Sequence, residues 1–223
     1  TEADVQTRLH ALIDPNTGKD FVTGKAVKKI GIGAGDIVVD IQLAYPAKTQ
    51  HEILKKLIAE DVARLPGAPR VTVNMTQKIT SHAVQRGVKL IPAVKNIIAV
   101  ASGKGGVGKS TTAVNLALAL QDLGLRVGVL DADIYGPSVP VLMGIEDGAR
   151  HVRMTEQHQI IPLQAFGMPV VSFGFFLGAK SPAVWRGPLV GKAVKQFARG
   201  VVWPELDVLV VDLPPGTGDV PLS

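Results

Sequence analysis

The residues best suited to chemistry form a glycine-rich stretch near the middle of the chain, Gly103-Lys104-Gly105-Gly106-Val107-Gly108-Lys109-Ser110. Their spacing fits the pattern G-x-x-x-x-G-K-[ST], in which a glycine-rich loop turns several backbone N–H groups towards one phosphate chain. An apolar run over 97–101 precedes the loop, and a stretch of helical periodicity over 109–123 follows it. A helix N-terminus behind the loop adds positive potential that favours an anion. The sequence therefore predicts a nucleotide-phosphate site.

The polar side chains of this stretch have separate predicted roles. Lys109 is expected to reach the β and γ phosphates of a nucleoside triphosphate, and the Ser110 hydroxyl to take one position on Mg²⁺. The remaining predicted contacts to the triphosphate come from Gly103, Lys104, Gly105, Gly106, Val107, Gly108 and Thr111.

Acidic residues follow two other apolar runs, where a phosphate-binding fold places its metal ligand. Asp212 closes the run 208–211 and precedes Pro214-Pro215-Gly216, whose Gly216 amide is placed to sense a γ phosphate. Asp131 and Asp133 follow the run 127–130. We expect Asp212 to hold the metal through its water shell and Asp133, further out of the sheet, to position the attacking water. Asp131 is expected to brace the loop that follows.

The elements that must position these residues have the pattern of an α/β domain. The runs 97–101, 127–130 and 208–211 are apolar almost without interruption, as in parallel strands buried on both faces. Helical stretches, 109–123 and 190–199, lie between them. The sequence predicts a P-loop NTPase domain with a parallel sheet over 96–223. No helix follows its last strand, so we expect the domain to be incomplete and the chain to be part of a longer protein.

A second, smaller domain precedes it. Helical spacing over 2–13, a strand pair over 27–33 and 36–44, a second amphipathic helix over 53–62 and a strand over 71–75 follow in order. These elements predict a small α+β domain over 1–78. A linker over 79–95, with weak periodicity and scattered charge, joins the two domains.

Composition limits what the protein can be. Its 223 residues contain no cysteine, so the chain itself forms no disulfide and has no thiolate ligands for zinc or an iron–sulfur cluster. It shows neither a secretory signal nor an apolar run long enough to cross a bilayer. We therefore expect a cytoplasmic protein with no membrane contact. The net charge of +5 falls within 1–95, where no aromatic residues alternate with the basic ones to stack bases. We therefore expect no nucleic-acid partner.

The glycine loop, with Lys104 inside it, resembles the deviant Walker A motif of the nitrogenase iron protein, MinD and ParA group. Three further segments resemble the Mrp/ApbC branch, the iron–sulfur cluster carriers: Asp131–Ser138 (DADIYGPS), Val184–Pro188 (VWRGP) and Asp212–Asp219 (DLPPGTGD). Residues 14–18 and 43–46 resemble the small iron–sulfur-assembly domain that such carriers bear ahead of the ATPase.

This resemblance implies a slow ATPase that forms a homodimer, in which Lys104 reaches the partner's nucleotide and assists catalysis together with Lys109 and Asp133. It also implies a cluster, expected to be 4Fe–4S, that passes to iron–sulfur apo-proteins. Two departures stand out: Ala47-Lys48 replaces a cysteine found in many relatives, and the C-terminal C-x-x-C is absent. The cluster ligands are therefore expected beyond Ser223, in the full-length protein only.

Two other readings remain open from the sequence. A ParA or MinD type positioning ATPase would share the P-loop, but it would carry a basic DNA-binding face or a terminal amphipathic membrane helix. A nucleotide-dependent binding module without turnover is favoured if Asp133 does not face water.

Overall fold

The computed structural model describes residues 1–33, 35–67, 70–81, 91–176, 194 and 196–216. The chain divides into two compact units, Thr1–Thr80 and Ser81–Ser223, called here the N-terminal and C-terminal units. Part of the predicted linker, 82–90, lies outside the described residues, as do the Val184–Pro188 motif and the end of the Asp212–Asp219 motif.

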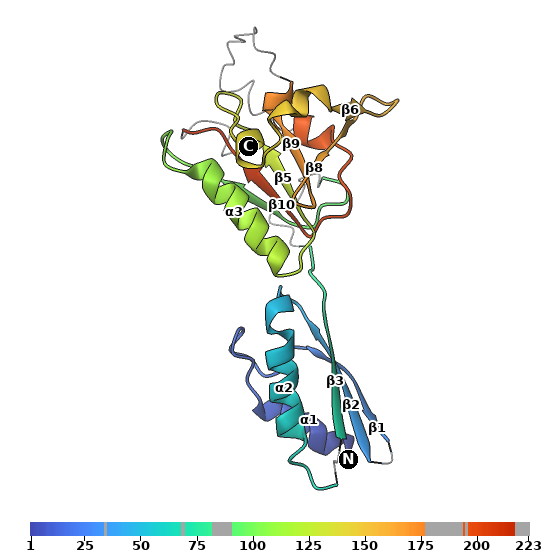
Figure 1. Cartoon of the computed structure of the whole chain (residues 1–223). Coiled ribbons are helices and arrows are strands. Elements are labelled where there is room, and N and C mark those ends of the chain that lie inside the picture. Colours follow the sequence, from blue (N-terminus) through green and yellow to red (C-terminus); the bar gives the residue numbers. More distant parts are fainter. Residues whose placement is uncertain (34, 68–69, 82–90, 177–193, 195, 217–223) are drawn as a thin grey trace. The chain divides into compact units, whose positions relative to one another are not determined.

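The N-terminal unit is a three-stranded sheet with helices on one face (Figure 1). Strand β2 lies in the centre, antiparallel to β1 and parallel to β3. Alternate residues of β2, Ile37, Val39, Ile41 and Leu43, are buried against α1 and α2, as the period of two along a strand requires. The elements are α1 Glu2–Ala11, β1 Val27–Ile32, β2 Asp36–Leu43, the short 3-10 helix η1 Lys48–Gln50, α2 His51–Val62 and β3 Arg70–Gln77.

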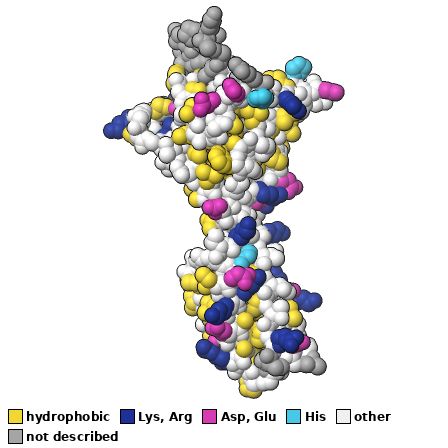
Figure 2. Space-filling model, viewed as in Figure 1, with side chains coloured by type: hydrophobic (Ala, Val, Ile, Leu, Met, Phe, Trp, Pro, Cys, Tyr) yellow, Lys and Arg dark blue, Asp and Glu magenta, His cyan; other side chains and the backbone are white. Residues whose placement is uncertain are grey.

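Basic side chains are common on the N-terminal unit, and several lie beside acidic ones. On the face drawn in Figure 2, its Lys and Arg side chains are interspersed with Asp and Glu. Lys55 Nζ lies 2.8 Å from Glu52, Lys56 Nζ 3.8 Å from Glu60, and an Arg8 nitrogen 3.6 Å from Asp61. These mixed charges have the pattern of a solvated surface.

The C-terminal unit contains a five-stranded sheet in the order β4-β10-β5-β9-β8. The first four strands of this order are parallel, and β8 is antiparallel to β9. The parallel strands therefore present their carboxyl ends along one edge, where the chemistry was predicted. The elements are β4 Ile97–Val100, α3 Lys109–Asp122, β5 Val127–Asp131, α4 Val139–Leu142, η2 Glu146–Arg150, β6 Arg153–Met154, β7 Ile160–Ile161, β8 Leu163–Ala165, β9 Met168–Ser172, η3 Phe173–Phe175 and β10 Val208–Asp212.

The predicted α/β fold with a parallel sheet and a preceding small α+β domain is confirmed, with one correction. Residues 97–101 were expected to form a strand buried on both faces. Strand β4 does form, but Ile97 is 50% exposed. In the described residues β4 pairs only with β10, so it is an edge strand and its apolar residues are incompletely covered. Half of the predicted helix 190–199 lies outside the described residues, and its described residues, 194 and 196–199, are helical.

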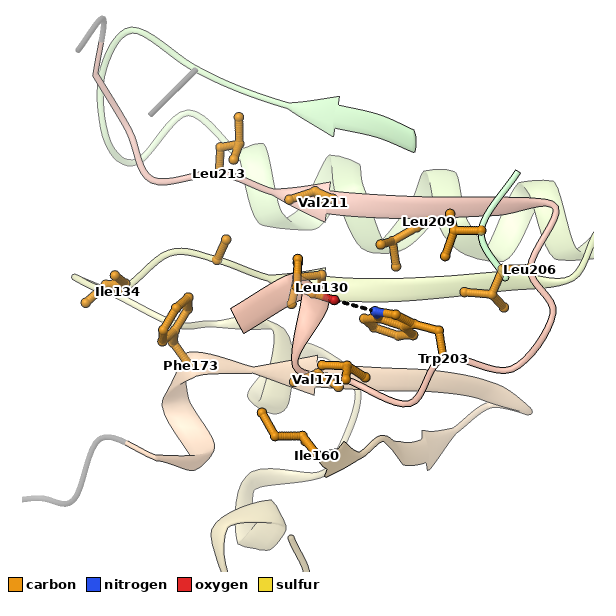
Figure 3. Close-up of a cluster of buried hydrophobic side chains, with 14 residues drawn as sticks. Leu130, Ile134, Ile160, Val171, Phe173, Trp203, Leu206, Leu209, Val211 and Leu213 are labelled. Atoms are coloured by element: carbon orange, nitrogen blue, oxygen red, sulfur yellow. Dashed lines mark hydrogen bonds between the residues drawn. The ribbon is translucent and has the colours of Figure 1, made fainter. Parts of the chain in front are cut away.

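The core of the C-terminal unit packs around Trp203, which precedes β10 (Figure 3). Its ring lies near Leu130, Leu206 and Leu209 in one buried cluster, and its Nε1–H donates to the Ala198 carbonyl at 3.0 Å. Gly128 of β5 allows Leu206 to pack closely against that strand, because a Cβ at this position would stand 2.7 Å from Leu206 Cδ1. The core thus holds β5 and β10, the strands that end in Asp131 and Asp212.

An ion-pair group joins the amino ends of three strands. Asp207 Oδ1 accepts hydrogen bonds from Lys95 Nζ at 2.6 Å and from the Arg126 guanidinium at 3.3 Å, and its Oδ2 accepts from the Arg126 backbone N–H at 3.0 Å. Burial alone would raise the pKa of Asp207. The hydrogen bonds from Arg126 and Lys95 outweigh that effect and lower this pKa to about 2.

This lowered pKa predicts a pH-dependent stability. A depressed carboxyl pKa stabilises the folded state above the unfolded-state value, and that stabilisation disappears as pH falls towards 2. We expect Asp207→Asn to lower the free energy of unfolding at pH 7 by about 2 kcal/mol and to flatten its dependence between pH 5 and 2. Urea unfolding followed by tryptophan fluorescence checks this, since Trp185 and Trp203 both belong to the C-terminal unit.

The matched control is Glu205→Gln. Glu205 also bonds Arg126, at 2.7 Å, but its side chain is 78% exposed. Its loss should cost less than about 1 kcal/mol. Parallel pH curves for wild type and Asp207→Asn would contradict the assignment.

Candidate nucleotide-phosphate site

The glycine loop lies between β4 and α3, at the carboxyl edge of the parallel sheet. Gly106 and Gly108 have φ angles of +74° and +85°, in the left-handed region that favours glycine. An ideal Cβ built at Gly103, Gly105, Gly106 or Gly108 would meet no atom within 4 Å, so the loop borders open space. The predicted phosphate-contacting backbone is therefore accessible, with α3 beginning directly behind it.

The loop is fixed to the neighbouring strand β10 and the segment after it. Leu213 N–H donates to the Val100 carbonyl at 3.0 Å, and Gly216 N–H donates to the Ser102 carbonyl at 2.8 Å. The Ser102 hydroxyl donates to the Lys104 carbonyl at 3.0 Å. The Gly216 amide, which the sequence placed near a γ phosphate, is thus used to join two loops.

Lys109 brings together the predicted acids. Its side chain is only 6% exposed, and Nζ donates to Asp212 Oδ1 at 2.5 Å. The same nitrogen lies 3.5 Å from Asp133 Oδ2. Asp133 and Asp212 are both buried, so one cation stands between two carboxylates in a place of low polarity. Three residues separated by up to 103 positions in sequence therefore meet at the first turn of α3.

The other predicted residues lie around this group. Lys109 Nζ is 3.5 Å from the Ser110 hydroxyl, which is partly buried. Lys104, Val107 and Thr111 are exposed on the loop and the first turn of α3. The structure thus brings Lys109, Ser110, Asp133 and Asp212 together. Within the described residues, no hydrogen bond or ion pair orients the Lys104 side chain.

Asp133 is oriented by its own loop. Its Oδ1 accepts the backbone N–H groups of Tyr135 and Gly136, both at 3.2 Å. This leaves Oδ2 as the oxygen that lies nearest Lys109. The position of the carboxylate therefore follows the backbone of the loop after β5.

Asp131 braces that loop, as expected. It is fully buried, and its Oδ1 accepts the Asp133 N–H at 3.1 Å. Its Oδ2 accepts from the Val139 N–H at 3.3 Å and from the Ser172 hydroxyl at 2.9 Å. Burial raises the pKa of Asp131 to about 7, although these hydrogen bonds oppose the shift. Ser172 was not predicted from the sequence, because a serine at the end of an apolar run belongs to no motif.

The residues present fit a magnesium ion. Asp212 Oδ2 is buried and has no hydrogen-bond partner in the structure. A buried carboxylate oxygen without a partner is costly, and a hard oxygen donor is the ligand type that Mg²⁺ prefers. No cluster of three or more His, Cys, Asp or Glu side chains able to hold a metal occurs among the described residues. Substrate phosphates and water would therefore complete the shell, as is usual for this ion.

The residues present do not fit an iron–sulfur cluster. The whole chain lacks cysteine, and thiolates are the usual ligands of such clusters. Ala47 of the Ala47-Lys48 pair is buried at the start of η1 and donates its N–H to Gln77 Oε1 at 3.0 Å.

Comparison with known proteins assigns both units of the chain to protein families. Residues 93–223 match the NUBPL iron-transfer P-loop NTPase family (ParA), and residues 2–75 match the iron–sulfur cluster assembly protein family. The iron–sulfur cluster carrier protein of Synechocystis is 39% identical over 98% of this chain and 62% of its own length. The Fe–S cluster assembly factor HCF101, chloroplastic, of Arabidopsis thaliana is 40% identical over 100% of this chain and 42% of its own length.

Among solved structures, a nucleotide-binding protein of Archaeoglobus fulgidus in complex with ADP is 41% identical, with a TM-score of 0.49 over 59% of this chain and 49% of that chain. The chain spans less than two thirds of the two curated relatives named above. The resemblance to iron–sulfur cluster carriers is confirmed, and the chain belongs to the NUBPL iron-transfer P-loop NTPase family.

Proposed function

We propose that this chain is the ATP-binding part of an iron–sulfur cluster carrier that hydrolyses ATP slowly. The observation that carries the proposal is the position of Lys109, held between Asp133 and Asp212 directly behind an open glycine loop. A phosphate chain laid on that loop would offer oxygens to the ammonium group and to the first turn of α3. The relatives named above are a carrier and an assembly factor, which favours this function over a positioning ATPase.

The proposed division of work follows the geometry. The loop amides from Gly103 to Gly108, with Lys109 and Thr111, bind the triphosphate, and Ser110 and Asp212 hold Mg²⁺, which offsets phosphate charge when bound. Asp133 Oδ2 orients a water molecule. The water oxygen then bonds to the γ phosphorus as the bond from that phosphorus to the β,γ-bridging oxygen breaks, giving ADP and phosphate, and the proton that the water loses passes to solvent.

A homodimer would give the exposed Lys104 its role. In this proposal Lys104 reaches the γ phosphate bound by the partner, where its charge contributes most as that phosphate leaves. We expect Lys104→Ala to lower kcat for ATP hydrolysis at least tenfold and to change ATP affinity less than threefold. Kinetics and sedimentation on the complete protein, with and without a nonhydrolysable ATP analogue, test this. A monomer under both conditions would contradict it.

The cargo and the location are also proposals. The cluster, expected to be 4Fe–4S, would be held by cysteines outside this chain, since a two-fold dimer can bridge one cluster with two cysteines from each subunit. Its recipients would be iron–sulfur apo-proteins in the cytoplasm. Among the described residues, the structure has no helix both long and apolar enough to cross a membrane.

Anaerobic reconstitution with iron and sulfide tests the carrier function. The 223-residue chain should remain colourless, because it has no cysteine. The complete protein should turn brown and should activate an iron–sulfur apo-enzyme when mixed with it. A complete protein that stays colourless, or that keeps its cluster in the presence of the apo-enzyme, would exclude the proposal.

A further inference from the structure

A buried polar network of Ser172 and Asp131 lies next to the loop that carries Asp133. Ser172, the last residue of β9, is fully buried. Its hydroxyl donates to Asp131 Oδ2 at 2.9 Å and accepts the Gly174 N–H at 2.9 Å. One hydroxyl therefore uses both its donor and its acceptor capacity to join β5, β9 and η3.

Asp131 extends this connection to the loop that carries Asp133. One oxygen accepts the Asp133 N–H, and the other accepts the Val139 N–H at the start of α4. The loop 132–138 is thus held at both ends by a single carboxylate. Ser172 fixes this carboxylate from the neighbouring strand, β9.

Packing connects the same segments a second time. A Cβ added at Gly174 would stand 3.0 Å from Pro137 Cγ, so η3 lies directly against the loop. Ile134 and Phe173 both belong to the buried cluster, and their side chains lie near one another in Figure 3. The loop is therefore confined by η3 as well as by Asp131.

We propose that Ser172 is a positioning residue for Asp133 in ATP hydrolysis. Acting through Asp131 and through the turn at Gly174, its hydroxyl fixes the loop backbone from which the Asp133 carboxylate meets the attacking water. Asp133 Oδ1 is bonded to the N–H groups of its own loop, so a shift of that backbone moves Oδ2 with it. This inference rests on the proposed function.

Kinetics on the complete protein test the proposal. Small misplacements of a reacting group cost up to about 100-fold in rate, so we expect Ser172→Ala to lower kcat at least tenfold. Affinity for a nonhydrolysable MgATP analogue should change less than threefold, because Ser172 and Asp131 hydrogen-bond η3, the Asp133 loop and α4 and not the backbone of the glycine loop. Ser172→Thr keeps the hydroxyl and should recover most of the rate. Equal kcat for wild type and Ser172→Ala would overturn the proposal, as would equal losses in the Ala and Thr variants.

A double-mutant cycle separates positioning from a general structural role. If Ser172 acts through Asp133, then Ser172→Ala should have less than a twofold further effect on kcat in an Asp133→Asn background. The same tenfold loss in that background would overturn the proposal.

Amide hydrogen exchange keeps the inference separate from the proposed function. Without nucleotide, Ser172→Ala should speed exchange of the Tyr135 and Gly136 amides at least tenfold, and Ser172→Thr should not. Unchanged exchange would overturn the inference whether or not the protein hydrolyses ATP. If exchange is faster in Ser172→Ala but the wild type does not hydrolyse ATP, the structural connection holds. The proposed function, and with it the catalytic purpose of Ser172, is then refuted.

Discussion

Lys109→Ala should lower the affinity of the protein for MgATP by about 10- to 100-fold. Its ammonium group is the buried cation of the site, 2.5 Å from Asp212 and 3.5 Å from Asp133. Loss of one charge-assisted phosphate contact costs about 1.5–3 kcal/mol. Titration with a fluorescent ATP analogue, displaced by ATP, measures the change. Lys104→Ala is the matched control, since Lys104 is an exposed lysine in the same loop, and its affinity should stay within threefold of wild type.

The same substitution should also weaken the fold. Without Lys109, the buried carboxylates of Asp133 and Asp212 lose their counter-charge, and breaking a buried ion pair in this way costs about 3–5 kcal/mol. Urea unfolding measured alongside the titration therefore shows how much of the protein is folded, so that affinities are compared only for folded protein. Affinity equal to that of wild type in folded Lys109→Ala would contradict the assignment of the site.

Trp203→Ala should destabilise the C-terminal unit by about 3–5 kcal/mol, the usual cost of removing a large buried aromatic ring. Trp203 is 5% exposed at the centre of the core, and its Nε1–H bonds Ala198. For a unit of this size the melting temperature should fall by about 10 °C. Thermal unfolding followed by circular dichroism provides the measurement.

Two controls separate the parts of this effect. Trp203→Phe keeps most of the ring volume and should lose about 1 kcal/mol for the hydrogen bond, plus a smaller packing loss. Val202→Ala changes the neighbouring residue, which is 43% exposed, and should cost less than about 1 kcal/mol. If all three variants melt within 2 °C of wild type, the described core does not hold the strands together.

Local patterns in the sequence predicted most of the fold. The continuous apolar runs before Gly103, Asp131 and Asp212 indicated parallel strands, and β4, β5 and β10 formed there. The exposure of Ile97 was not predictable, because an apolar run does not show whether its strand lies in the centre or at the edge of a sheet. Strands β8 and β9 were also missed, because β8 has only three residues and β9 contains Pro169, a residue that argues against a strand inside a sheet.

The site was predictable where a motif existed. The glycine loop identified Lys109, and the rule that parallel strands end along one edge brought Asp133 and Asp212 to it. The contact between Lys109 and both carboxylates was not predictable from the sequence, because it depends on the order of β4, β10 and β5 in the sheet. Ser172 could not be found from sequence, since its only distinguishing property is the buried oxygen opposite its hydroxyl.

The central claim is that the glycine loop binds the triphosphate of ATP. Competition between ATP and a phosphate chain that has no base tests it most directly. Calorimetric titration of the chain with MgATP, with and without saturating tripolyphosphate, measures this competition. The account predicts one saturable site per chain, which tripolyphosphate blocks and Lys109→Ala weakens at least tenfold. Binding that tripolyphosphate leaves unchanged, or no saturable binding at millimolar MgATP, would contradict a phosphate site at the glycine loop.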